Sequence, residues 1–340
     1  MKIKPMENNI IMKERKLPTF IIAGAARSGT TTLYQLLRKH PDVYMSPVKE
    51  TNFFVNNLIG RNGPGDRLAI PDIDCHILHS LRQKGGFLHV GLVTQSNIYC
   101  ALFEDANDDI YAIGEASPSY LYYSKTSSER IYEIIPRAKI IILLRNPIER
   151  ALSNYRLFYM SGREYLEISS AMCEEKIKNR LKDGWEPFWD YLGLGLYARQ
   201  VEKFLHRFGH DQVRVWLYED FWKDPQNSFN EICKFIGIKA IKIEHLRAEN
   251  SSKNKVWTAK YKIRKVPIIR SMLKIIPRPI KQFVAEYLDT QLGTRIDMPK
   301  NVRERLLEYY KEDILMLHQL LPHLQVTRWI EDEQKKLKDE

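Results

Sequence analysis

Cysteines and long apolar runs are scarce in this chain. Among its 340 residues are four cysteines, at positions 75, 100, 173 and 233, and none of them forms a Cys-x-x-Cys pair. Neither a structural zinc site nor a disulfide framework is therefore expected, which fits a reducing compartment. No apolar run approaches the roughly 20 residues that cross a bilayer, and residues 1–18 are charged without an apolar centre. We therefore expect no transmembrane segment, no signal peptide and a cytoplasmic location.

Acidic residues are also in deficit. The chain has 42 Asp and Glu against 53 Lys and Arg, so its net charge is +11, which favours anionic partners. Ten basic residues and no acidic ones fall in segment 251–285, the basic segment. It could be a solvated helix face, close over a nucleotide, or dock on an anionic glycan or a membrane surface as a peripheral contact. No recognisable nucleic-acid module accompanies the charge, so we expect no nucleic-acid partner.

One stretch near the N-terminus carries the strongest functional signal. The apolar run Phe20–Ala23 predicts a buried strand, a loop from Gly24 to Gly29 follows, and spaced leucines then predict a helix. Free N–H groups and the helix dipole make such a turn a phosphate cradle, and the glycine spacing is that of a P-loop. However, Thr30 stands where a P-loop has lysine, and Arg27 is the only cation of the loop. The loop is therefore suited to phosphate but not to the terminal phosphates of ATP.

Strand-like and helix-like segments alternate along the chain. The apolar patterns predict strands at 20–23, 43–45, 139–144 and 213–218, and helices at 30–40, 127–135, 197–208, 227–236 and 302–321. This alternation predicts an α/β fold with a P-loop-like, doubly wound parallel sheet flanked by helices, built as a single domain with insertions. We expect residues 1–16 to form a flexible arm and residues 17–335 to form the domain, with the basic segment inside it.

Four motifs occur in a fixed order along the chain. They are Arg27-Ser28-Gly29-Thr30-Thr31, then Lys49-Glu50 ahead of Phe53-Phe54, then 114–121 (GEASPSYL), then 144–155 (LRNPIERALSNY). Together they resemble the sulfotransferases that use 3′-phosphoadenosine 5′-phosphosulfate (PAPS), in the branch with glycan-modifying and bacterial enzymes, over residues 18–330. The resemblance implies transfer of a sulfuryl group from PAPS to a hydroxyl or amine of a carbohydrate or small natural product. The product nucleotide would be 3′-phosphoadenosine 5′-phosphate (PAP), and no metal would take part.

The resemblance also implies which residues bind the donor. The 5′-phosphosulfate would be held by the loop residues Ala26, Arg27, Ser28, Gly29, Thr30 and Thr31. Arg27 would neutralise the charge that develops on the bridging oxygen as sulfur leaves phosphate. Arg145 and Ser153 would bind the 3′-phosphate, because the guanidinium fork gives two parallel hydrogen bonds to phosphate oxygens.

The resemblance implies the catalytic base as well. Glu50 matches the position of the base that takes the proton of the acceptor, and Lys49 beside it would keep this carboxylate ionised. Several glycan sulfotransferases have a lysine where this chain has Ala116, and this departure concerns the acceptor rather than the reaction type.

Two other classes of function are open from the residues alone. A P-loop kinase or ATPase would need a lysine after Gly29 and an aspartate that ends a second strand and holds Mg²⁺. The chain has Thr30 and Arg145 at those places. A non-enzymatic anion binder is the second alternative, and it is suggested by the net charge.

Overall fold

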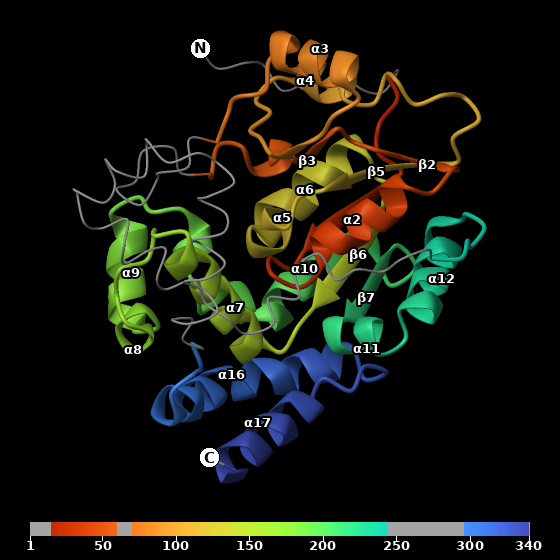
Figure 1. Cartoon of the computed structure of the whole chain (residues 1–340). Helices are drawn as coiled ribbons and strands as arrows, with labels where there is room; N and C mark the ends of the chain where they lie inside the picture. Colours follow the sequence, from red (N-terminus) through yellow and green to blue (C-terminus); the bar gives the residue numbers. More distant parts are fainter. Residues whose placement is uncertain (1–14, 60–69, 244–295, 340) are drawn as a thin grey trace, which may run out of the picture.

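The centre of the molecule is a five-stranded parallel sheet (Figure 1). The computed structural model describes residues 15–59, 70–243 and 296–339. The order of the strands is β2-β5-β1-β6-β7, and a separate parallel pair is formed by β3 and β4. The strands are β1 (Phe20–Gly24), β2 (Val43–Met45), β3 (Val48–Glu50), β4 (Leu88–Val90), β5 (Ala112–Ala116), β6 (Lys139–Leu144) and β7 (Val213–Leu217).

Helices surround both sheets. The α-helices are α2 (Thr30–Arg38), α3 (Cys75–Lys84), α4 (Ser96–Ala101), α5 (Ser119–Tyr122), α6 (Ser124–Ile134), α7 (Pro147–Met160), α8 (Ile168–Ala171), α9 (Glu174–Lys182), α10 (Tyr197–Phe208), α11 (Tyr218–Lys223), α12 (Pro225–Ile236), α16 (Lys300–Leu320) and α17 (Arg328–Asp339). Short 3₁₀ turns are η1 (Phe53–Val55), η2 (Pro187–Trp189) and η3 (Gly193–Gly195).

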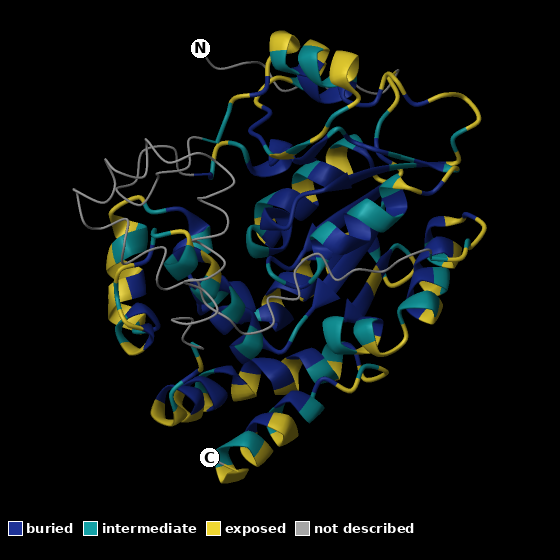
Figure 2. Cartoon of the chain, in the orientation of Figure 1, coloured by how far each residue is buried: buried dark blue, intermediate teal, exposed yellow. Residues whose placement is uncertain are grey.

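Both faces of the central sheet are covered, because successive strand residues point to opposite sides. On β6, Ile140 and Ile142 pack into one core with residues of α5, α6, α7 and α10. Ile141 and Leu143 pack into the other core with residues of α2 and α12. Figure 2 shows the strands buried between helices whose outer faces are exposed. This three-layer arrangement confirms the predicted α/β class with a parallel sheet.

The apolar runs located four of the five strands of the central sheet. All four strands predicted from apolar patterns are present, but β5, which lies between β2 and β1, was not expected, and neither were β3 and β4 of the separate pair. Gly114 and Glu115 interrupt its apolar pattern, and Gly114 is required because a Cβ there would lie 2.2 Å from the Phe20 ring.

Two sequence-based expectations concern segments that are wholly or largely outside the described residues. The basic segment is wholly outside them, and of the predicted arm only Arg15 and Lys16 are described. These two residues pair with Glu104 and Asp108 at 2.7 Å each. The division into an arm and a domain stays a prediction.

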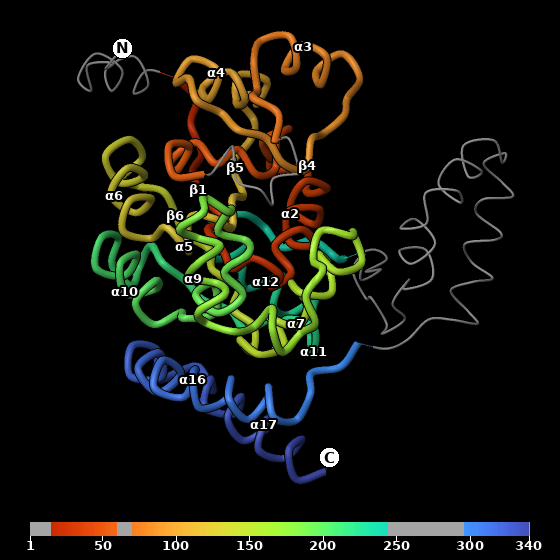
Figure 3. The backbone as a smooth tube through the Cα atoms, turned by 90° about the vertical axis from the view of Figure 1, so that its left-hand side faces the viewer, coloured from red at the N-terminus to blue at the C-terminus, as the bar shows by residue number. Residues whose placement is uncertain are grey.

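The C-terminal helices α16 and α17 lie together at one end of the molecule (Figure 1, Figure 3). Asn146, the N-cap residue of α7, donates from Nδ2 to Oε1 of Glu333 on α17 at 2.9 Å. Arg303 on α16 pairs with the same Glu333 and also with Glu149 on α7. The start of α7, directly after Arg145, is therefore braced by buried polar contacts from the end of the chain.

Asp313 on α16 gives a stability test. Burial raises the pKa of its carboxyl from 3.8 to about 6, although it accepts hydrogen bonds from the Ala198 N–H. The folded protein therefore binds this proton more tightly than the unfolded chain, and the stability present below pH 4 is lost as the pH rises through about 6. Relative to Asp313→Asn, the wild type should lose about 2–3 kcal/mol of unfolding free energy across that window. Urea titrations of both proteins at several pH values measure it; a flat or rising difference would contradict the assignment.

Candidate active site

The loop between β1 and α2 forms one wall of the site. Gly29, at φ +87°, precedes α2, and no side chain caps this helix within the described part of the chain. Arg27 also adopts a left-handed backbone, with φ +69°, which is rare for a residue with a side chain. Ser28 is fully buried, and its N–H donates to the Ala25 carbonyl at 3.2 Å. The loop therefore presents the N-terminus of a helix to the cavity described below.

The Arg27 side chain points across the site to α7. Its Nη2 and Nε donate to the Ser153 hydroxyl at 3.1 and 3.3 Å. Burial, together with the neighbouring guanidinium groups of Arg145 and Arg150, lowers the pKa of Arg27 to about 10. Arg27, Arg145 and Arg150 thus lie close together, and the described residues place few anions near them. The local electrostatic potential is therefore positive and suits an anionic ligand.

Arg145 follows β6 directly and lies beside the loop. Its Nη1 donates to the Arg27 carbonyl at 3.3 Å, and its guanidinium carbon lies 4.6 Å from the centre of the Tyr218 ring. The Arg145 carbonyl accepts from the Tyr197 hydroxyl at 2.9 Å. The side chain is therefore held by a carbonyl and an aromatic face, and its remaining N–H groups can serve a ligand.

Glu50 ends β3 and lines another part of the site. Its Oε1 accepts from Lys49 Nζ at 2.6 Å, and His89 Nε2 on the neighbouring strand β4 lies 3.9 Å from the same oxygen. Lys49 is fully buried, whereas 11% of the Glu50 side chain is exposed. Burial, Lys49 and Arg27 lower the pKa of His89, while Glu50 opposes them. A carboxylate with a buried cation behind it and an open face ahead is placed to accept a proton.

One cavity of about 570 Å³ joins these walls. Of the residues predicted for the site, those that line it are Ala26, Arg27, Gly29, Thr30, Thr31, Glu50, Arg145 and Ser153. The side chains of Ser28 and Lys49 are buried behind the wall and do not line it. Residues 118 positions apart, Arg27 and Arg145, thus face one space.

Much of the rest of the cavity is lined by residues outside the four motifs. Leu157 and Phe158 of α7, Phe188 of η2 and Val90 of β4 make much of it apolar. Arg163 adds a cation, which lies 5.5 Å from the centre of the Phe158 ring. Ala116 is fully buried at the end of β5. Only tertiary packing brings this wall together, so no local pattern could have marked it.

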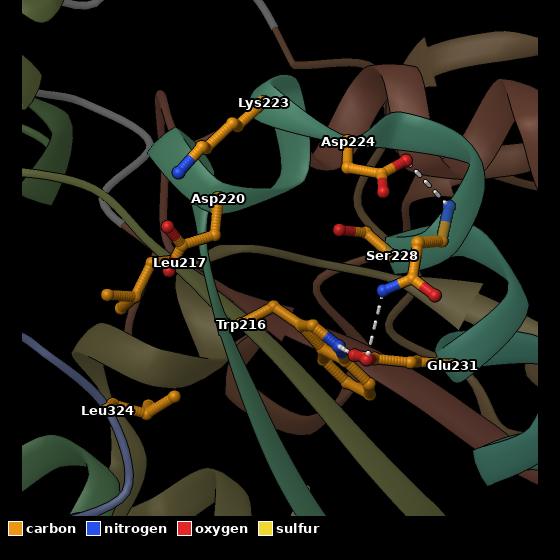
Figure 4. Close-up of a pocket in the computed structure, with 9 residues that line it drawn as sticks. Trp216, Leu217, Asp220, Lys223, Asp224, Ser228, Glu231 and Leu324 are labelled. Carbon is orange, nitrogen blue, oxygen red and sulfur yellow. Dashed lines mark hydrogen bonds between the residues drawn. The ribbon is translucent and has the colours of Figure 1, made fainter.

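A second cavity, of about 520 Å³, lies beside α11 and α12 (Figure 4). Its acidic groups have partners: Asp224 accepts from the Asn227 N–H, Glu231 from Trp216 Nε1, and Asp220 pairs with Arg328. None of the predicted site residues lines it. The acidic side chains of this cavity therefore stabilise the local fold.

The fold and the phosphate loop together define a P-loop-like α/β protein with a cavity lined by cations at the carboxyl ends of its strands. Residues 18–242 match the sulfotransferase family, and the chain belongs to this family. The structure is similar to the crystal structure of a sulfotransferase from Alicyclobacillus acidocaldarius. The TM-score is 0.67 at 28% identity, over 92% of this chain and 99% of that one.

Curated relatives are also similar in sequence. Human carbohydrate sulfotransferase 15 is 26% identical over 316 residues, which covers 81% of this chain and 54% of the relative. Mouse heparan sulfate glucosamine 3-O-sulfotransferase 3A1 is 25% identical over 227 residues, covering 67% and 47%. The chain therefore spans about half the length of these relatives.

The expectation of a cytoplasmic location is wrong. The similarity to mammalian carbohydrate and heparan sulfate sulfotransferases points away from the cytoplasm. A scarcity of cysteines and of long apolar runs does not determine the compartment in which a protein works.

In residues 15–59, 70–243 and 296–339, no helix is both long and apolar enough to cross a bilayer. In the same residues no cluster of three or more His, Cys, Asp or Glu side chains could hold a metal ion, and the metal-free reaction stays a prediction.

The loop geometry can be tested at Gly29. A Cβ there would combine a left-handed backbone with a contact of 3.2 Å to the Tyr218 ring, which packs against Arg145. Gly184 is a matched control, because its φ of +79° is similar but nothing lies within 4 Å of its Cβ position. We expect Gly184→Ala to lose about 1 kcal/mol and Gly29→Ala roughly 2–3 kcal/mol of unfolding free energy in urea titrations. Equal losses would mean that the ring does not restrict the loop.

Proposed function

We propose that the protein transfers a sulfuryl group from PAPS to a hydroxyl group of a carbohydrate. One observation carries the proposal: the phosphate loop, Arg145, Ser153 and Glu50 all line the same cavity. A nucleotide with phosphates at both ends of its ribose, and a reactive sulfuryl group on one of them, matches this arrangement. Membership of the sulfotransferase family supports the reaction type.

In this proposal the two phosphates of the donor bind separately. The N-terminus of α2 and the hydroxyls of Thr30 and Thr31 bind the 5′-phosphosulfate, where the helix dipole favours negative charge. Arg145 and Ser153 bind the 3′-phosphate. The hydrogen bonds between Arg27 and Ser153 connect the two subsites, so binding at either one changes the surroundings of the Arg27 guanidinium.

The proposed reaction is a single in-line displacement at sulfur. Glu50 takes the proton of the acceptor hydroxyl as its oxygen forms a bond to sulfur. The bond between sulfur and the 5′-phosphate oxygen breaks, and the electron pair leaves with PAP. Arg27 and the N-terminus of α2 stabilise that departing negative charge, which in a dry site is worth several kcal/mol.

The acceptor side of the cavity guides the choice of substrate. Sulfotransferases of carbohydrate and heparan sulfate are similar to this chain, which supports a carbohydrate acceptor. Arg163 supplies a cation on that side of the cavity, where burial lowers its pKa and Glu186 opposes this effect. We expect an acceptor that places an anionic group near Arg163 and an apolar face against Phe158 and Phe188.

The role of Glu50 predicts a separation of turnover from binding. Glu50→Gln should lower PAP formation from PAPS roughly 10²–10⁴-fold, measured with a panel of glycans and small alcohols as acceptors. The affinity for PAP should stay within about twofold, because the amide oxygen can still accept from Lys49 and the donor subsites are untouched. Glu231→Gln in the second cavity is the matched control. Normal turnover by Glu50→Gln would remove the base from the proposal.

Arg145 should behave in the opposite way. Arg145→Ala should weaken PAP binding roughly 10- to 100-fold, the range of a charge-assisted hydrogen bond, while adenosine 5′-phosphate binding changes little. Titration calorimetry with both nucleotides measures the difference, with Arg207→Ala on the exposed face of α10 as the control. Equal weakening for both nucleotides would show that Arg145 does not bind the 3′-phosphate.

A further inference from the structure

Glu115 is fully buried at the end of β5, and the proposed reaction does not use it. Its Oε1 accepts hydrogen bonds from Ser117 at 2.8 Å, from Tyr120 at 2.6 Å and from Thr51, the residue after Glu50. Its Oε2 accepts from Tyr99 at 2.6 Å. Four hydroxyl groups thus surround one carboxyl group.

No basic side chain among the described residues forms a salt bridge with Glu115. Burial raises the pKa of its carboxyl, and the hydrogen bonds from Thr51, Tyr120, Tyr99 and Ser117 oppose that shift. A group so costly to bury calls for a reason beyond packing.

The reason lies in the direction of the hydroxyl protons. Each hydroxyl carries one proton, so a hydroxyl that donates to Glu115 has only acceptor capacity left. Three of the four oxygens then accept from three consecutive backbone N–H groups. The pairs are Asn52 to Ser117 at 3.2 Å, Phe53 to Thr51 at 3.4 Å and Phe54 to Tyr120 at 3.5 Å.

The turn held in this way is attached to Glu50. Asn52 has a left-handed backbone, with φ +52°, and its Nδ2 donates to the carbonyls of Glu50 and Gly91 at 3.1 Å each. Its Oδ1 accepts from Ser119 at 2.5 Å. The turn therefore connects the ends of β3 and β4 to the end of β5 and the start of α5.

We infer that Glu115 is a positioning residue: its Oε1 takes the protons of three hydroxyls, whose oxygens then hold the turn behind Glu50 and fix the direction of the Glu50 carboxylate. This inference rests on the proposed function, because Glu115 acts only through Glu50. It requires an acceptor oxygen at Oε1, and it does not require a charge. If Oε2 carried a proton, that proton would point to Tyr99 and the three bonds at Oε1 would stay.

The need for a hydrogen-bond acceptor at Oε1 predicts different turnover for two substitutions of Glu115. Glu115→Met removes the acceptor and should lower turnover of PAPS to PAP roughly 10- to 100-fold. This is the loss expected when a catalytic group, here the Glu50 carboxylate, is displaced by about 1 Å. Glu115→Gln keeps an oxygen at Oε1 and can donate from Nε2 to Tyr99, so it should stay within about fivefold of the wild type. Turnover is normalised to folded protein and measured with the same acceptor panel. If the glutamine variant is as slow as the methionine variant, the proton-direction account is overturned.

Two tyrosines provide a second pair of variants if Glu115→Met does not fold. Tyr99 and Tyr120 both donate to Glu115, but only Tyr120 also accepts from the turn. Tyr120→Phe should therefore slow turnover clearly more than Tyr99→Phe. Equal effects would overturn the inference.

A double-mutant cycle with Glu50→Gln distinguishes positioning from general destabilisation. In the Glu50→Gln background, adding Tyr120→Phe or Glu115→Met should lower turnover little further, because that variant has no carboxylate base whose position could matter. Losses that multiply would overturn the inference while leaving Glu50 as the base. If Glu50→Gln alone retains full turnover, the proposed function fails first, and the two failures are thus distinguishable.

Discussion

The site depends on the parallel pairing of β1 with β6. Gly24 lies opposite Ile142, and the Ala25 N–H donates to the Leu143 carbonyl at 2.7 Å, so the ladder continues to the edge of the sheet. Both strands end there, and each gives way to a loop and a helix. The phosphate loop and Arg145 therefore emerge side by side, and Arg145 reaches the Arg27 carbonyl. A change of register between these strands would separate the two cationic groups.

A second constraint places Glu50 in the same cavity as those cations. β3 belongs to a separate two-stranded sheet, so the register of the central sheet does not set its position. Instead, the turn after Glu50 is hydrogen-bonded to Glu115 of β5 and Ser119 of α5, while Lys49 supports the carboxylate from the buried side. The anion-binding wall is built by backbone pairing, whereas the wall with the carboxylate is built by buried side-chain hydrogen bonds.

This difference explains how much could be predicted from the sequence. The run Lys139–Leu144 and the glycines around Arg27 are local signals of a buried strand and a tight turn, so the fold class and the phosphate loop were accessible. The Glu115 cluster was only partly accessible: Glu115, Ser117 and Tyr120 belong to the motif 114–121, but no local pattern links them to Thr51 and Tyr99. The sequence placed Lys49 beside Glu50, but it gave no sign that the Lys49 side chain is fully buried. Arg163 and Phe188 enter the site only through the packing of the segments after α7.

The central claim is that one adenosine nucleotide is held by both of its phosphates at the ends of β1 and β6. A crystal structure of the protein with PAP tests it most directly. The account predicts the 5′-phosphate at the N-terminus of α2, the 3′-phosphate within hydrogen-bond distance of Arg145 and Ser153, and Glu50 facing the open side of the 5′-phosphate. A nucleotide bound elsewhere, or one whose 3′-phosphate points away from Arg145, would contradict the account.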